Sequence, residues 1–156
     1  MKLYTVGYEG CDIDDFVKGL KRNKINCLID VRKNPVSRKK GFSKSKLRES
    51  LNKAGIEYEH FSSLGVPSAW RKKQKAHLMT RKKMFDDYTK KILPIHQNEI
   101  EKVIKLATAS RSAALLCYEA NALDCHRHFL TEEILKHKKF KVVDLILEPQ
   151  KKSLLG

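Results

Sequence analysis

Short runs of apolar residues alternate along the chain with longer segments in which apolar residues recur at helical spacing. The short runs predict β-strands, because they are rich in aliphatic side chains and are followed by polar or turn-forming residues. The expected strands are residues 3–6, 25–31, 56–61, 112–117 and 141–147. Residues 25–31 and 112–117 are almost continuously apolar, which is typical of strands covered on both faces. Residues 56–61 alternate between apolar and polar side chains, which favours a place near the edge of the sheet.

The segments between the predicted strands have the apolar spacing and the end signals of α-helices. The expected N-caps, whose side chains accept hydrogen bonds from the first helical turn, are Asp12, Ser43, Thr80 and Asp124. The helix capped by Asp124 should begin near Cys125. Pro94 should separate the helix that follows Thr80 from the next one, since proline interrupts helical hydrogen bonding.

The order of the predicted elements indicates the fold class. Residues 62–80 contain Gly65, Pro67 and a run of basic residues, so they are predicted to form a mobile loop. Elsewhere strands alternate with helices, which predicts a mostly parallel sheet with right-handed crossovers and helices on both faces. A chain of 156 residues has the usual size of one domain and can bury a core without disulfides or a structural metal. The expected fold is a single three-layer α/β domain over residues 1–156.

The charge balance points to anionic partners. The chain has 33 Lys and Arg residues against 18 Asp and Glu residues, with a formal net charge of +15. A field of this sign attracts phosphate-bearing molecules, so a small phosphate compound or a nucleic acid is the expected partner. The alternative is a solvated, lysine-rich surface whose only effect is to keep the protein in solution.

Several features predict a cytoplasmic protein. The N-terminal residues enter a strand-like pattern at once, so neither a signal peptide nor a membrane anchor is expected. No apolar stretch is long enough to cross a bilayer. The cysteines are Cys11, Cys27, Cys117 and Cys125. They are too few and too scattered for the disulfide framework of a secreted protein, and a reducing cytosol should keep them as thiols.

Polar and charged residues gather directly after the predicted strands. The carboxyl ends of parallel strands meet at one edge of a sheet, and open α/β sheets bind their ligands there. The polar segments are residues 7–10, 30–38, 60–63 and 119–127. Four separate segments of the chain should therefore line one basic cleft.

Four motifs resemble those of a known family. They are GYEG, DVRKNPVSR, FSKSKL and, late in the chain, LLCYEANALDCHR. As a set they are similar to the domain-of-unknown-function family 488 (DUF488), and the likeness covers most of the chain. The resemblance implies an α/β fold and a shared polar cleft. It implies no particular reaction, so the chemistry has to be argued from the residues.

The candidates for catalysis are Asp30, Glu119, Cys125 and His126. Asp30 and Glu119 can form a carboxylate pair, with one as base or nucleophile and the other as acid or ligand anchor. Alternatively, each pairs with an arginine and orders the loops. A helix N-terminus would favour the thiolate of Cys125, with His126 as a neighbouring base, but a buried structural thiol is the commoner fate of cysteine.

No cofactor is expected, and no metal site is predicted. Cys117, Cys125 and His126 are the available soft ligands, but the sequence has no short Cys-x-x-Cys pair and no second cluster of ligands. Zinc sites usually show both features in their spacing. The prediction is therefore a site without a metal ion.

Basic residues on separate loops predict an anion site, because several guanidinium groups can grip one phosphate or carboxylate. The expected anion-binding residues are Tyr8, Arg32, Ser37, Arg38 and Arg127. The expected nucleic-acid-binding residues are Trp70, Arg71, Lys72 and Lys73. In the second group the Trp70 ring would stack on a base while the cations meet phosphates. The alternative is a solvated basic loop whose Trp70 packs on the body of the protein.

Together these patterns predict an intracellular enzyme that acts on a phosphate-bearing substrate, either a nucleotide or a nucleic acid. The reaction class would be that of a hydrolase or transferase that uses a carboxylate or a cysteine. The alternative is a non-catalytic nucleic-acid-binding module that uses the same basic cleft and loop.

Overall fold

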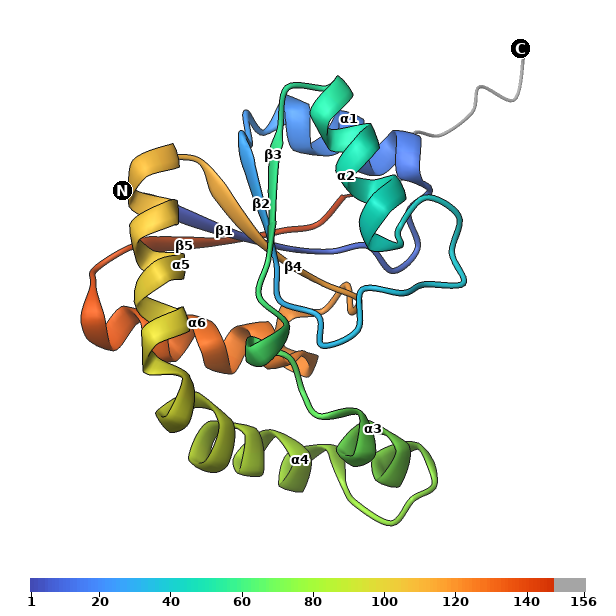
Figure 1. The fold of residues 1–156 in the computed structure, drawn as a ribbon, viewed down its shortest axis with the longest axis vertical. Coiled ribbons are helices and arrows are strands. Elements are labelled where there is room, and N and C mark those ends of the chain that lie inside the picture. Colours follow the sequence, from blue (N-terminus) through green and yellow to red (C-terminus); the bar gives the residue numbers. More distant parts are fainter. Residues whose placement is uncertain (148–156) are drawn as a thin grey trace.

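A parallel β-sheet forms the centre of the computed structural model, which describes residues 1–147 (Figure 1). The strands are β1 (Lys2–Gly7), β2 (Cys27–Asp30), β3 (Glu57–His60), β4 (Ala113–Cys117) and β5 (Lys141–Leu145). Their order across the sheet is β3-β2-β4-β1-β5, and all neighbouring strands are parallel. The predicted α/β class and parallel sheet are confirmed. The end of the predicted domain, residues 148–156, lies outside the described residues.

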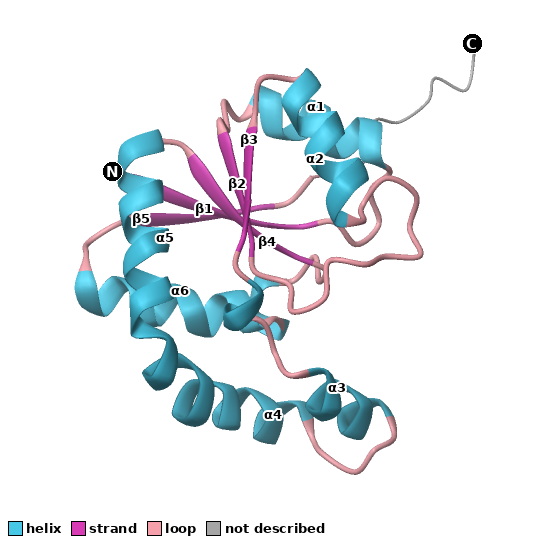
Figure 2. Ribbon diagram, in the orientation of Figure 1, coloured by secondary structure: helices cyan, strands magenta, loops and turns pink. Residues whose placement is uncertain are grey.

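Helices connect the strands (Figure 2). The α-helices are α1 (Ile13–Arg22), α2 (Lys44–Lys53), α3 (Ser68–Lys75), α4 (Arg81–Asp87), α5 (Gln97–Ser110) and α6 (His126–His137). Asp12 caps α1 by accepting a hydrogen bond from the Asp15 amide, and Thr80 caps α4 by accepting one from the Lys83 amide. Both caps follow the sequence prediction. None of the helices in residues 1–147 has the length and apolar character needed to cross a membrane.

The core is divided into two apolar clusters by the sheet. Alternate side chains of β2 enter different clusters: Ile29 packs in the cluster that includes residues of α5 and α6, whereas Leu28 packs in the one that includes residues of α1 and α2. This division is the expected result of the two-residue period of a strand. In Figure 2 the helices α1 and α2 lie on one side of the sheet, and α5 and α6 lie on the other.

The position of β3 follows from its sequence. The strand lies at one edge of the sheet. Ile56 and Tyr58 are buried, whereas Glu57 and Glu59 are exposed. The alternation between apolar and charged side chains therefore predicted the edge position correctly.

The prediction of a loop over residues 62–80 was wrong for its middle part. Ser68–Lys75 forms α3, and it lies beside α4 (Figure 1). Good helix formers dominate this segment, and a short turn links it to the next helix. We call these two helices the α3–α4 pair. The basic run that the sequence assigned to a loop is thus carried on a helix.

The expected interruption at Pro94 was also wrong in form. The chain stays helical from α4 to α5, passing through a π-helical turn at Tyr88–Ile92 and a 3-10 turn at Leu93–His96. Proline is tolerated in the first turn of a helical segment, where its missing N–H would have no partner in any case. Pro94 therefore changes the helix type and does not create a loop.

Backbone hydrogen bonds join the segments after β1 and β2 to β4 and to the loop that follows it. The Glu9 amide donates to the Tyr118 carbonyl at 2.8 Å, and the Val31 amide donates to the Leu116 carbonyl at 3.1 Å. Gly7 permits the closest approach, because a Cβ atom at this position would lie 1.8 Å from the Glu119 carbonyl oxygen. The end of β1 and the loop after β4 therefore fit together only without a side chain at Gly7.

Replacing Gly7 by alanine should destabilise the protein by about 3 kcal/mol, since a methyl group would displace the backbone of Glu119. Urea unfolding measures this loss. Gly10→Ala is the control, because no heavy atom lies within 4 Å of its added Cβ and only its left-handed backbone (φ +81) opposes the change. The control should cost about 1 kcal/mol. Equal losses in the two variants would contradict the close approach.

Candidate functional site

An open cavity of about 630 Å³ lies at the carboxyl edge of the sheet, between the strand loops and the α3–α4 pair. This volume is within the usual range of small-molecule sites. The basic residues that line it are Arg32, Lys33, Arg71, Lys75 and Arg81. The acidic residues that line it are Glu9, Glu119 and Asp124. The predicted polar cleft thus exists, but α3 and α4 supply much of its positive charge.

The α3–α4 pair directs two arginines at one carboxylate. Glu119 Oε1 lies 3.8 Å from Arg71 Nη1 and 3.6 Å from Arg81 Nη2. Arg81 is also fixed by Asp124, because its Nε donates to the carboxylate at 2.7 Å and its Nη2 donates to the carbonyl at 2.8 Å. Within residues 1–147, the guanidinium of Arg71 donates no hydrogen bond. Arg71 can therefore bind an anion in the cavity.

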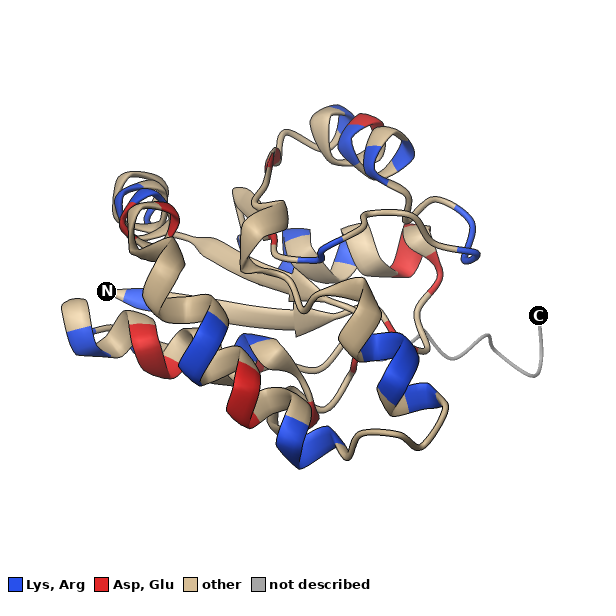
Figure 3. Ribbon diagram, turned by 60° about the horizontal axis from the view of Figure 1, so that its bottom comes forward, with Lys and Arg blue, Asp and Glu red and all other residues tan. Residues whose placement is uncertain are grey.

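Basic residues are concentrated on α3 (Figure 3). Arg71 and Lys75 line the cavity, whereas Lys72 and Lys73 are exposed outside it. Trp70 is partly buried and packs against the core cluster on the α5 and α6 side of the sheet. The structure therefore separates the Trp70 ring from the exposed lysines with which the sequence had grouped it.

Asp30 is completely buried in a hydrogen-bonded ion pair with Arg32. Arg32 Nε donates to one carboxylate oxygen of Asp30 at 2.9 Å, and Nη2 donates to the other at 2.8 Å. The Tyr58 hydroxyl donates to the same carboxylate at 2.5 Å. The structure thus agrees with the alternative in which Asp30 pairs with an arginine and orders the loops. Asp30 does not line the cavity.

Arg32 has little capacity left to grip a ligand. Its remaining nitrogen, Nη1, donates to the Phe42 carbonyl at 2.7 Å and to the Tyr8 hydroxyl at 3.3 Å. Burial lowers the pKa of Arg32, but the hydrogen bond and charge of Asp30 outweigh this effect and the net pKa is raised. Arg32 therefore stays charged and forms part of the cavity wall, beside the ring of Tyr8.

The arginine clamp predicted from the sequence is not assembled around the cavity. Arg127 is completely buried, and its guanidinium donates to Cys117 Sγ at 3.0 Å, the Glu119 carbonyl at 2.5 Å and the Ala120 carbonyl at 3.2 Å. Arg38 is exposed and does not line the cavity. Ser37 donates its amide to the Ser43 hydroxyl at 3.0 Å and so orders the start of α2. Burial lowers the pKa of Arg127.

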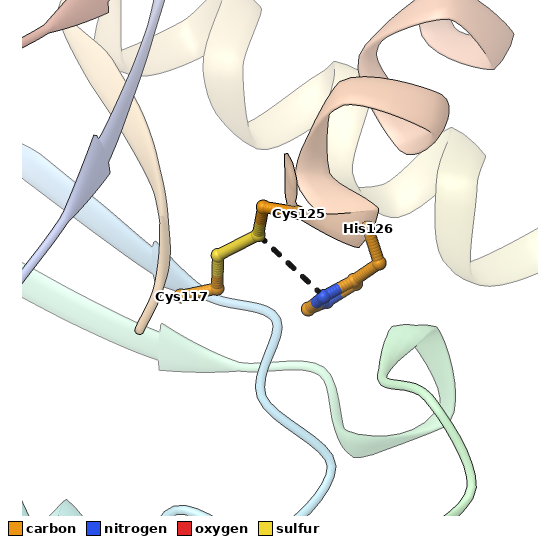
Figure 4. Close-up of side chains that lie close together, drawn as sticks. All are labelled: Cys117, Cys125 and His126. Carbon is orange, nitrogen blue, oxygen red and sulfur yellow. Dashed lines mark hydrogen bonds between the residues drawn. A yellow bond between two sulfur atoms is a disulfide. The ribbon is translucent and has the colours of Figure 1, made fainter. Parts of the chain in front are cut away.

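Cys117 and Cys125 form a disulfide, whereas the sequence predicted free thiols (Figure 4). Cys117 ends β4, and Cys125 is the N-cap of α6. The prediction that Asp124 caps this helix was wrong, because Asp124 belongs to the preceding 3-10 turn and binds Arg81.

The other cysteines, Cys11 and Cys27, are free and buried. Burial is the largest cause that raises the pKa of Cys27 to about 12.

His126 is buried beside the disulfide. Its Nε2 lies 2.8 Å from the Val31 carbonyl, and its Nδ1 lies 3.8 Å from Cys125 Sγ. Burial, followed by the charge of Arg71, lowers the pKa of His126 to about 3. The ring is therefore neutral, and because a carbonyl only accepts, its proton is on Nε2.

Among the residues that line the cavity, Glu119 is the one member of the predicted catalytic set. Sequence reasoning missed Tyr118, whose side chain is 46% exposed and which lines the cavity next to Tyr8. The two rings meet edge to face with their centroids 5.3 Å apart. The signal was available, since Tyr118 directly follows β4. Sequence reasoning also missed Lys75 and Arg81, because nothing local places the α3–α4 pair next to the strand ends.

Asp30→Asn should destabilise the protein by at least about 3 kcal/mol, because it leaves the buried Arg32 charge without its counter-ion. Chemical denaturation monitored by circular dichroism measures the loss. Glu59→Gln, at an exposed position of β3, is the matched control and should change stability by no more than about 0.5 kcal/mol. If both variants were equally stable, Asp30 would have no structural role, and its carboxylate would be free for chemistry.

Comparison with known proteins adds one match. A family model described as "Domain of unknown function DUF488" matches residues 12–134. No curated protein and no solved structure matches the chain. The matched range includes β2, the α3–α4 pair, β4 and most of α6, and so contains most of the residues around the cavity. The family suggested by the four sequence motifs is therefore confirmed, and the chain belongs to the DUF488 family.

Proposed function

We propose that this protein is an enzyme that binds a phosphate-bearing small molecule in the cavity, with Arg71 as its principal anion ligand. One observation carries the proposal: Arg71 and Arg81 both lie within 4.0 Å of a single carboxylate oxygen of Glu119. Two guanidinium groups are thus already directed at one negatively charged oxygen. At 3.6 and 3.8 Å these contacts are longer than hydrogen bonds, so a phosphate oxygen can form shorter ones.

The rest of the cavity suits such a ligand. Lys33 and Lys75 line it, and neither side chain forms an ion pair within residues 1–147. They supply positive charge for further phosphate oxygens. Tyr118 adds exposed aromatic surface to the same wall, next to the buried ring of Tyr8, and this surface fits a planar group such as a nucleobase. A nucleotide combines both features and is the proposed substrate class.

Glu119 is the proposed general base. Its side chain is only 14% exposed and lines the cavity. When a phosphate takes over the two arginines, this carboxylate is freed to accept a proton from an attacking water or hydroxyl group. The arginines meanwhile stabilise the negative charge on the phosphate oxygens. Hydrolysis or transfer of a phosphate group is therefore the proposed reaction class.

The second candidate is the non-catalytic nucleic-acid-binding module. The observation in its favour is the row of cations on α3, where Lys72 and Lys73 project outside the cavity. Trp70 gives it no support, because the ring packs against the core. Binding of this kind would be led by phosphate contacts and would weaken steeply as the salt concentration rises.

Nucleotides should raise the melting temperature of the wild-type protein by several degrees at saturating concentration, because the ligand binds only the folded state. Arg71→Ala should weaken this binding at least about tenfold, since a hydrogen-bonded charge is lost. Arg22→Ala removes the same charge from the exposed end of α1 and is the control. A thermal-shift screen with nucleotides, phosphosugars and short oligonucleotides makes the comparison. Stabilisation by oligonucleotides alone, abolished by salt, would favour the binding module.

Glu119→Gln should retain or tighten nucleotide binding while turnover falls at least about 100-fold, because the amide cannot accept the proton. Binding is measured by calorimetry, and turnover by release of phosphate or of the transferred product. Glu101→Gln, at an exposed position of α5, is the control for loss of a carboxylate. Unchanged turnover in Glu119→Gln would show that Glu119 is not the general base.

A further inference from the structure

Three side chains of the types that bind metals lie close together, beside the cavity-lining residue Glu119. The sulfur atoms of Cys117 and Cys125 and a ring nitrogen of His126 all lie within 4.8 Å of one another, and all three residues are buried (Figure 4). They come from the end of β4 and the start of α6. The two cysteines lie eight positions apart in the sequence, so the short spacing of a zinc motif is absent although the ligands are close in space.

The hydrogen bond of His126 leaves the lone pair of Nδ1 free, on the side of the ring that faces Cys125. Nε2 donates to the Val31 carbonyl at 2.8 Å, so Nδ1 is the ring nitrogen left to bind an ion. Nδ1 faces Cys125 Sγ at 3.8 Å. Histidines that bind metals usually donate their second ring N–H to a carbonyl or carboxylate in this way, which fixes both tautomer and ring orientation.

Hydrogen-bond donors also lie beside both sulfur atoms. Arg127 Nη1 lies 3.0 Å from Cys117 Sγ, and the Arg127 amide lies 3.5 Å from Cys125 Sγ at the N-terminus of α6. Each sulfur therefore has a donor that stabilises negative charge. Two thiolates offset the charge of a divalent ion, so the metal-bound group as a whole would be neutral. A neutral group can lie beside the buried Arg127 without strong repulsion.

The backbone spacing of the two cysteines is compatible with an ion between them. Their Cα atoms lie 7.5 Å apart. Most disulfides span about 4.4–6.8 Å between Cα atoms. A tetrahedral zinc ion about 2.3 Å from each sulfur would hold the sulfurs roughly 3.8 Å apart. The separation of the two main-chain segments thus provides room for the ion after reduction.

We propose that the reduced protein binds one Zn²⁺ ion, or a similar thiophilic divalent ion, through Cys117, Cys125 and His126. A thiol or phosphine reductant first supplies two electrons, and with two protons the S–S bond becomes two thiols. The ion then displaces both thiol protons. Oxidation by a disulfide or peroxide reverses the process and releases the ion. Three protein ligands leave a fourth position for water or for Glu119 Oε2, which lies 3.4 Å from Cys117 Sγ.

Metal binding can be tested without any nucleotide, so its failure is distinguishable from failure of the proposed function. The full-length protein is reduced with a phosphine, freed of reductant under anaerobic conditions and titrated with Co²⁺. We expect one Co²⁺ per chain, with thiolate-to-cobalt charge-transfer absorption that Zn²⁺ abolishes by displacement. Two protons should be released per ion, as a pH indicator can record.

Cys125→Ser and His126→Gln should weaken Co²⁺ binding at least about 100-fold. The matched control is Cys27→Ser, which removes a free buried cysteine that does not belong to the cluster and should retain the absorption. Circular dichroism checks that each variant is folded. If a variant does not fold, the comparison of reduced with oxidised wild-type protein still tests the proposal. Reduced wild-type protein without a one-to-one cobalt spectrum, or oxidised protein with the same spectrum, would overturn the proposal.

Discussion

The candidate site depends on a charged group that has no contact with solvent. The Arg127 guanidinium is completely buried. Its two terminal nitrogens replace lost water by donating to Cys117 Sγ and to the carbonyls of Glu119 and Ala120, whereas its Nε has no hydrogen-bond partner within residues 1–147. A buried charge without such partners would be very costly. The compensation fixes the path of the chain after β4. It thereby sets the direction of the Glu119 carboxylate and places Cys117 next to the start of α6.

Local pattern was enough to predict the framework. Continuous apolar runs marked β2 and β4 as inner strands, and alternation marked β3 as an edge strand. Asp12 and Thr80 marked the beginnings of helices. These signals depend only on neighbours in sequence. The same information failed for α3, because glycine, proline and a basic run resemble a loop. It failed again for Pro94, where helical structure continues through a change of helix type.

The site was predictable in position but not in the roles of its arginines. Parallel strands bring their carboxyl ends together, so the cleft could be located from the strands alone. Whether Arg32 turns inward to Asp30 or outward to a ligand depends on Tyr58 and Phe42, which are distant in sequence. Likewise, the contribution of Arg81 depends on how the α3–α4 pair lies over the strand ends. Tertiary contacts of this kind produce no periodic pattern in the sequence, so they could not be predicted from it.

In the α3–α4 pair, the side chains of α3 that line the cavity are largely separate from those that form the core. One continuous segment between β3 and α5 supplies a wall of the cavity, and α3 contributes no buried residue to the core. Apart from Trp70, which packs against the core cluster, the side chains of α3 contribute little to the packing of the sheet and its covering helices. Substitutions on the cavity side of α3 are therefore free to alter ligand preference at little cost in folding. Within such a family, one scaffold can diversify its chemistry by varying a single helix.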